Sequence, residues 1–303
     1  VRSRRQRQMC IRDSYTRVKS ASAVRAMLGV LNPIGRGITL NRGNVLTYRT
    51  PNYLMSSAQH YRPGDFGDQQ HLWHVPLPGA INIFGNHPGS TQLSSESRPA
   101  TPSGWVGNGV NPDVAQFNNV LLVLHDLRVR RGMYEGRRHE LSHVYFPFVN
   151  FDETTLSERV VAGRFGTSMI GLVSLERLEM VSQTELVQRG IVTAWALVAS
   201  DLSEFSSLAG FARALKAARL VHGRGGITFM IKHSNAPDSP SARHQYRLHW
   251  QGDLAVDGVR MNTHYWRHDN DWVAAPRDAD SFTVHGRDKA LHLEWKDASR
   301  TEG

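Results

Sequence analysis

The sequence is almost without cysteine, because Cys10 is the only one among 303 residues. The chain after residue 10 therefore cannot form a disulfide, bind a metal through thiolates or use a cysteine nucleophile. It also lacks a run of about 18 apolar residues, the minimum for a membrane-spanning helix. The first residues contain arginines but no apolar segment of a secretory signal. These absences argue against a thiol enzyme and against a membrane partner.

Acidic residues are scarce at the start of the chain. Residues 1–31 hold eight basic side chains and one acidic one, which is +7 of the formal net charge of +9. Residues 32–303 therefore carry only +2. Nucleic-acid-binding proteins usually concentrate their positive charge on the folded surface. This distribution argues against nucleic acid as a partner.

The opening stretch RQRQMCIRDS resembles translated sequencing-adaptor sequence at the ends of environmental assembly fragments. The resemblance implies that residues 1–14 are not native and that the gene is truncated at its 5′ end. We expect residues 15–35 to be a linker or the end of a missing upstream domain. The native start and any signal peptide would then be missing as well.

Short strands dominate the sequence from about Asn44 onwards. Apolar runs such as GAINIFGN and NNVLLVLHDL are separated by Gly, Pro, Asn and Asp. YRLHW and LHLEW alternate apolar and polar residues, as a half-buried strand does. Many strands with few helices predict a mainly β fold, a large antiparallel β-sandwich of the super-sandwich type over residues 36–297. We expect residues 298–303 to form a tail.

One segment has helical periodicity, SEFSSLAGFARALKAARL at 203–220. Its apolar residues recur at helical spacing and form one stripe, which is Phe205, Leu208, Phe211, Ala212 and Leu215. Ser203 is the predicted N-cap. We expect this helix to pack on a sheet as part of the core.

The pentapeptide HELSH, from His139 to His143, matches the H-E-x-x-H motif of zinc proteases. That motif works on a helix, where both imidazoles lie on one face beside the glutamate. Here Gly132 and Gly136 precede it, and Pro147 follows a segment typical of a strand. The sequence therefore favours His139 and Glu140 on a polar turn before a strand, with a zinc metallopeptidase as a minor alternative.

The densest cluster of polar and aromatic residues lies at 56–89. RPGDFGD predicts a tight loop, because proline fixes φ and glycine allows positive φ. In the extended segment that follows, Gln69, His71 and Trp73 would share one face. Such a face suits a sugar, because an indole stacks on a pyranose while amides and imidazoles bind hydroxyls or a carboxylate. The alternative is that these side chains satisfy backbone groups of the loop.

A second cluster lies at 104–119 and contains Trp105, Asn108, Asn111 and Gln116. These side chains can converge with the first cluster to form one pocket. The GNG within this segment is also typical of an ordinary turn.

A family resemblance rests on the order of five segments: YLMSSAQHYRPGDFGDQQHLWHV, GAINIFGNHPGS, WVGNGVNPDVAQFNNVLLVLH, SHVYFPFVNFDE and LHLEWKD. This order resembles the β-sandwich part of heparinase II/III-like and related polysaccharide lyases. Those bacterial proteins pair an (α/α) toroid with a C-terminal sandwich, and much of their catalytic machinery lies on the toroid. The resemblance spans about residues 36–297 and implies that a toroid domain is missing from this chain.

The resemblance implies β-elimination on a uronic-acid-containing polysaccharide. The uronate carboxylate must be neutralised, and a tyrosine or histidine then removes the C5 proton. On this basis the candidate catalytic residues are His71, His87 and Tyr61. The candidate substrate-binding residues are Arg62, Gln69, Gln70, Trp73, Trp105, Asn108 and Gln116. No cofactor or metal is expected, and the substrate class implies a periplasmic or secreted protein.

Three hypotheses follow from the sequence. The first is the sandwich half of a polysaccharide lyase or a related sugar-active enzyme. The second is a non-catalytic sandwich that binds glycan or supports the missing domain. The third is the zinc metallopeptidase. A glycosidase would need two carboxylates at a defined separation, which a sequence does not reveal.

Overall fold

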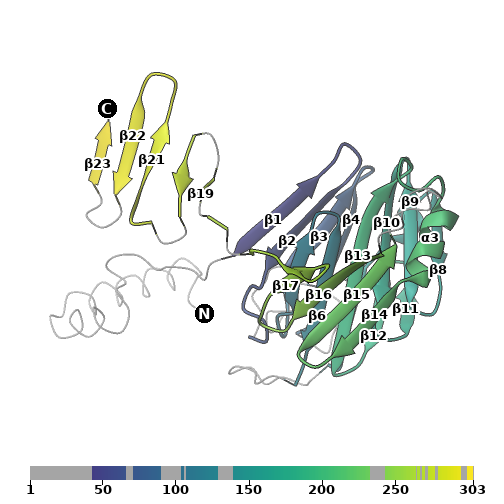
Figure 1. Ribbon diagram of the computed structural model, residues 1–303. Helices are drawn as coiled ribbons and strands as arrows, with labels where there is room; N and C mark the ends of the chain where they lie inside the picture. Colours follow the sequence, from purple (N-terminus) through teal and green to yellow (C-terminus); the bar gives the residue numbers. More distant parts are fainter. Residues whose placement is uncertain are drawn as a thin grey trace, which may run out of the picture. The chain divides into compact units, whose positions relative to one another are not determined.

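A computed structural model describes residues 43–65, 71–89, 104–105, 107–128, 139–232, 243–263, 265–266, 268–269, 272–276, 279–294 and 299–302. Most of these residues are in antiparallel strands, and one α-helix accompanies them (Figure 1). The predicted mainly β sandwich is therefore confirmed. The expectations for residues 1–14 and 15–35, and for Gln69 and Gln70, lie outside the described residues.

The largest sheet, here called sheet A, has seven strands. All its strand pairs are antiparallel. Its order is β1 (Asn44–Arg49), β2 (Leu54–Gln59), β3 (Trp73–Leu77), β4 (Ile81–Asn86), β7 (Leu141–Tyr145), β12 (Glu185–Arg189) and β11 (Leu178–Ser182). A short 3₁₀-helix, Phe148–Asn150, follows β7.

The second sheet, sheet B, has six antiparallel strands. Its order is β5 (Asp113–Phe117), β6 (Val120–Asp126), β13 (Val192–Asp201), β10 (Ser168–Ser174), β9 (Val160–Phe165) and β8 (Glu153–Leu156). Strands β5 and β8 are therefore its two edges.

The third sheet, sheet C, has five strands and follows helix α3 (Leu208–Ala217) in the chain. Its order is β14 (Arg219–Gly223), β15 (Gly226–Lys232), β16 (Arg243–His249), β17 (Leu254–Val256) and β18 (Val259–Arg260). Two small sheets complete the chain. They are β19 (His268–Asp269) with β20 (Ala274–Ala275), and β21 (Ser281–His285) with β22 (Ala290–Glu294) and β23 (Ser299–Glu302). Strand β23 thus occupies part of the stretch that we expected to be a tail.

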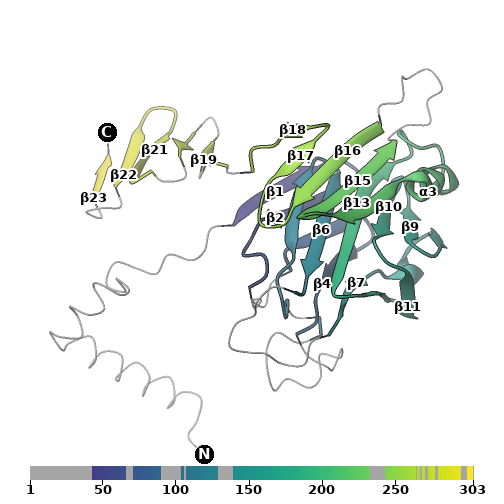
Figure 2. The same ribbon diagram turned by 60° about the horizontal axis from the view of Figure 1, so that its bottom comes forward.

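Sheet B lies between the other two large sheets, and two hydrophobic cores result (Figure 2). In strand β6, Leu121 and Val123 join the core toward sheet A, whereas Leu122 and Leu124 join the core toward sheet C. Alternate residues of a strand point to opposite faces, so a sheet covered on both sides needs apolar residues at every position. The uninterrupted run VLLVL is therefore a consequence of this middle position.

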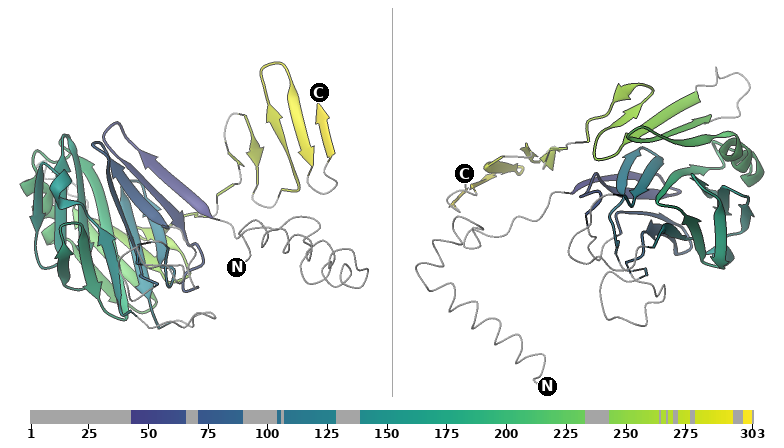
Figure 3. Two further views of the ribbon diagram at one scale, coloured as in Figure 1. Left: turned by 180° about the vertical axis from the view of Figure 1, so that it is seen from behind. Right: turned by 90° about the horizontal axis from the view of Figure 1, so that it is seen from below.

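Helix α3 packs against β9 and β10 beside sheet C (Figure 3). The predicted stripe is confirmed, because Phe205, Leu208, Phe211, Ala212 and Leu215 are all buried. A buried leucine or phenylalanine side chain stabilises the fold by about 1.5–3 kcal/mol. The predicted N-cap is wrong, since the hydroxyl of Ser207 accepts the Gly210 backbone N–H and begins the helix. Ser203 instead donates its hydroxyl to Asp201.

Candidate functional site

The outer face of sheet A, the face turned away from sheet B, carries the candidate site. On strand β7, Ser142 faces sheet B, because its hydroxyl accepts hydrogen bonds from Thr193 and Trp195 of β13. Val144 also faces sheet B and belongs to the core there. His143 and Tyr145 must therefore point to the outer face.

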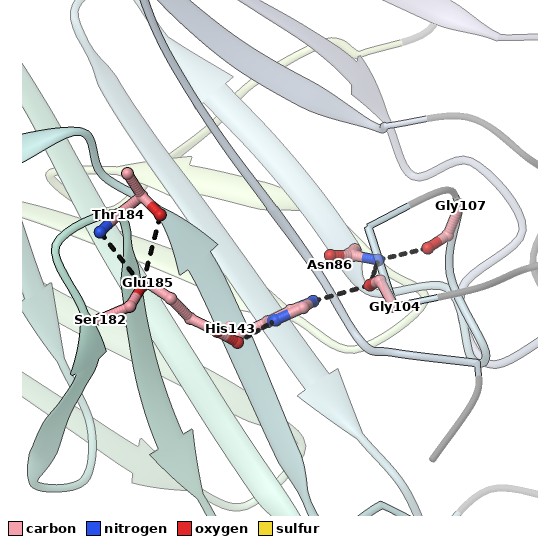
Figure 4. Close-up of polar contacts among 7 residues, drawn as sticks. All are labelled: Asn86, Gly104, Gly107, His143, Ser182, Thr184 and Glu185. Atoms are coloured by element: carbon pink, nitrogen blue, oxygen red, sulfur yellow. Dashed lines mark hydrogen bonds and ion pairs between the residues drawn. The ribbon is translucent and has the colours of Figure 1, made fainter. Parts of the chain in front are cut away.

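His143 forms the buried centre of this face (Figure 4). Its Nδ1 lies 2.8 Å from the Glu185 carboxylate of β12, and its Nε2 lies 2.9 Å from the carbonyl oxygen of Gly104. A carbonyl can only accept, so Nε2 carries a proton. Both ring nitrogens of His143 thus face oxygen atoms of the protein.

The segment that begins at Gly104 crosses the outer face and is fastened there by side chains of sheet A. The amide nitrogen of Asn86 donates to the carbonyl oxygens of Gly104, at 3.0 Å, and of Gly107 (Figure 4). This places the Trp105 ring flat on the His143 ring, with centroids 3.8 Å apart and an interplanar angle of 11°. Trp105 is half-buried, so its indole covers His143 and presents its other side outward.

A row of stacked rings adjoins Trp105. His71 stacks on Phe84 with centroids 4.2 Å apart, and Phe84 stacks on Tyr145 at 5.2 Å. The indole of Trp105 stands edge-on to both Phe84 and Tyr145, at 82° and 88°. We call Trp105, His71, Phe84 and Tyr145 the ring platform. Its members are at least partly exposed, which is unusual for four contacting rings.

His71 is the member of the platform with acid–base capacity. Its Nε2 donates to the Trp105 carbonyl oxygen at 2.6 Å, so the lone pair of a neutral ring is on Nδ1. Partial burial of the ring lowers the His71 pKa, and the nearby His74 and His143 act in the same direction. His74, on β3, is exposed, and burial of part of its ring lowers its pKa too. His71 is therefore a neutral imidazole at pH 7 with an acceptor nitrogen.

His87 has a different environment from the one that we predicted for a catalytic group. It is 3 % exposed. Its Nδ1 accepts the Val110 backbone N–H at 3.0 Å, and its Nε2 donates to the His139 carbonyl oxygen at 2.8 Å. Both ring nitrogens thus form hydrogen bonds with backbone groups, and the ring is neutral. His87 anchors the 104–112 segment and does not face a polymeric substrate, which corrects its proposed acid–base role.

A further histidine, His125 of β6, lies behind His87 and His143. It is fully buried, and burial together with those two imidazoles lowers its pKa well below the ordinary value. Among the residues that the structure describes, neither its Nδ1 nor Nε2 of His139 has a hydrogen-bond partner. A buried polar atom without a partner costs about 1–3 kcal/mol, so this end of the interface between sheets A and B is destabilised locally.

Three predicted substrate-binding residues are internal. Trp73 is 1 % exposed and belongs to the core between sheets A and B, so its indole cannot stack on a sugar. Gln116 is also buried and bonds to Ser57 and to backbone oxygens. Asn108 is fully buried and accepts the His87 backbone N–H. Gln116 and Asn108 therefore satisfy buried polar groups, whereas Trp73 is a core residue whose indole N–H has no hydrogen-bond partner among the described residues.

The loop after β2 contains Tyr61 and Arg62. Tyr61 packs at the margin of the core between sheets A and B, and Arg62 forms an ion pair with Asp65 at 3.0 Å. In the described part of the predicted loop, Arg62 and Gly64 have positive φ, whereas residues 66–68 lie outside the described residues. Of the predicted residues, the structure brings His71 together with Trp105, and His87 together with Asn108.

The segment HELSH does not form the helix that a zinc-protease motif requires. His139 and Glu140 are in coil, and His143 is in strand β7. Both ring nitrogens of His143 already face protein atoms. Within the part of the chain that the structure describes, no three His, Cys, Asp or Glu residues form a group that could hold a metal.

Phe84, Tyr145 and Glu185 belong to the site but were not predicted from the sequence. The alternation in IFGN and LSHVY identifies Phe84 and Tyr145 as partners on one face only after their strands are known to be neighbours. Glu185 comes from β12, and no sequence signal links it to His143.

Comparison with known proteins finds no matching family model, no similar curated protein and no similar solved structure. Among the described residues, no helix combines the length and apolar character needed to cross a membrane.

Proposed function

We propose that this chain is the β-sandwich portion of a polysaccharide lyase, and that the outer face of sheet A binds a uronic-acid-containing glycan. The observation that carries the proposal is the ring platform. Trp105 and the Phe84–Tyr145 pair offer apolar ring surface for the flat side of a pyranose, and His71 beside them offers a polar group for its substituents.

The chemistry assigned to the platform is removal of the C5 proton of a uronate. His71 has the required features, because its ring is neutral at pH 7 and its Nδ1 lone pair has no partner among the described residues. In the proposed step, Nδ1 takes the C5 proton, the C4–C5 double bond forms, the C4–O bond to the leaving sugar breaks, and a general acid protonates the departing oxygen. The uronate carboxylate must be neutralised meanwhile. The proposal assigns part of the machinery to an upstream toroid domain.

The sequence 128–138, which lies between β6 and β7 in the chain, contains five arginines and one glutamate, a composition that suits an acidic ligand. A periplasmic or secreted location is part of the same proposal, because acidic polysaccharides occur outside the cytoplasm.

The second candidate function is glycan binding without turnover. It is favoured by the environment of His87, which removes one of three candidate catalytic groups from the surface. The two functions differ in their dependence on His71. A His71→Asn variant keeps a hydrogen-bond donor but loses the base, so a lyase would lose turnover while a binding protein would keep its affinity.

The experiment is absorbance near 235 nm with a panel of uronic-acid polysaccharides, combined with affinity electrophoresis on the same glycans. We expect a rise in absorbance with one substrate for wild-type protein and no rise for His71→Asn at unchanged affinity. Binding without any rise, also with an upstream toroid supplied, would establish the second function. Absence of binding by wild-type protein would refute both.

A further inference from the structure

A groove of about 580 Å³ lies between edge strand β8 and helix α3, on a different sheet from the ring platform. One wall is formed by Glu153, Thr154 and Thr155 of β8, and the other by α3. The helical positions that line it are Leu208, Ala209, Ala212, Arg213 and Lys216. Their spacing of three and four residues puts them on one side of the helix, and Leu208 and Ala212 among them also belong to the buried stripe.

The strand wall of the groove is an unpaired sheet edge. Strand β8 ends sheet B and pairs only with β9 among the described strands. Three of its four residues are exposed. An edge strand presents a row of backbone N–H and C=O groups that can hydrogen-bond to another extended chain. Proteins use such edges to bind peptides by strand addition.

The charge of the groove is positive. Neither Arg213 nor Lys216 has an ion-pair partner among the described residues, and both are exposed. Glu153, the acidic residue of the lining, lies 2.6 Å from Nη2 of Arg164, and the same guanidinium also pairs with Asp152 at 3.4 Å. The lining thus holds two cations, Arg213 and Lys216, against one acid, and the cations would meet acidic side chains of an added strand.

The lining also distinguishes between classes of ligand. It contains no aromatic ring, which sugar binding would favour, and its apolar residues are Leu208, Ala209 and Ala212. Two small alanine side chains beside a free edge leave room for a backbone and one row of side chains. From these features we infer that the groove binds an extended acidic segment of a partner protein, which adds as a strand to β8 and pairs its carboxylates with Arg213 and Lys216.

The test uses a fluorescein-labelled peptide of alternating glutamate and valine, eight residues long, and its lysine–valine counterpart. We expect the acidic peptide to bind the whole chain and the basic one not to bind. The double variant Arg213→Glu/Lys216→Glu should weaken binding at least tenfold, and Ala209→Trp should do so by filling the groove. The control is Arg243→Glu/Arg247→Glu, which makes the same charge change at two exposed arginines of β16.

Amide hydrogen exchange then distinguishes strand addition from binding by charge alone. Strand addition predicts slower amide exchange in residues 153–156 when the acidic peptide is bound. Binding without that protection, or equal weakening by the β16 control, would overturn the inference. So would failure of the acidic peptide to bind. Binding of an oligogalacturonate with the same sensitivity to Arg213 and Lys216 would make the groove a glycan site and would also overturn it.

Discussion

The indole of Trp105 lies flat on the imidazole of His143, 3.8 Å away, while Glu185 holds that imidazole from its edge at 2.8 Å. The stack fixes Trp105 and leaves its outer side for a ligand. The central ring of the platform is thus positioned by His143 in the absence of a ligand.

The first prediction concerns Trp105 as the principal contact for glycan. Trp105→Ala removes the central ring of the platform, so we expect at least a tenfold loss of glycan affinity, because aromatic contacts at a binding site are worth about 1–3 kcal/mol each. Affinity electrophoresis or calorimetry measures it. The matched control is Trp266→Ala, since Trp266 is 53 % exposed and is not part of the platform. Equal losses in both variants would contradict a specific role for Trp105.

The second prediction concerns the buried partnership of Glu185 with His143. Glu185→Ala leaves His143 buried without its partner, which we expect to lower the free energy of unfolding by about 3 kcal/mol. Glu179→Ala is the control, because its ion pair with Arg189 on the same sheet is exposed and such pairs contribute about 0.5 kcal/mol. Urea denaturation compares the two. If they were equal, the His143–Glu185 contact would have no special energetic weight.

The sequence reveals the layers of this fold better than it reveals the site. The apolar run NNVLLVLHDL predicted a short strand, and the stripe from Phe205 to Leu215 predicted the packed helix, because both patterns are local. The site depends on which strands are neighbours. Trp73 and His74 are adjacent, and only the pairing of β3 with β2 and β4 decides that the tryptophan faces the core and the histidine faces outward.

The same limitation explains the wrong assignment of His87. The polar residues beside it in the sequence are typical of a pocket. In the structure, however, both ring nitrogens form hydrogen bonds with the backbone of Val110 and His139, which belong to two distant segments. Conversely, the H-E-x-x-H motif made His143 a candidate zinc ligand, and that role needs a helix. Its partners in the structure come instead from β12 and from the segment at Gly104.

The third prediction concerns pH and the buried His125. Its pKa in the folded protein is well below the ordinary value of 6.5, so the folded state binds fewer protons than the unfolded state below that pH. The stabilisation is therefore complete above pH 6.5 and is lost as the pH falls below it. We expect the urea midpoint to decrease between pH 7 and pH 5.

His125→Leu should make this decrease smaller but not abolish it, because His71, His74 and His139 also have lowered pKa values. An unchanged pH dependence in His125→Leu would show that His125 is not a source of the effect.

The last prediction concerns the contact between helix α3 and the middle sheet. Gly171 of β10 lets the helix approach closely, since a Cβ at this position would lie 2.1 Å from the Leu215 side chain and 3.1 Å from Phe211. Gly171→Ala must push the helix away or force these buried side chains out of their rotamers, which costs about 1–3 kcal/mol.

Gly223→Ala on β14 is the matched control, because a Cβ there meets nothing within 4 Å. Urea denaturation should give a clear loss of stability for Gly171→Ala and none for Gly223→Ala. A neutral Gly171→Ala would mean that α3 can shift freely on sheet B, and the groove between α3 and β8 would then lack a fixed width.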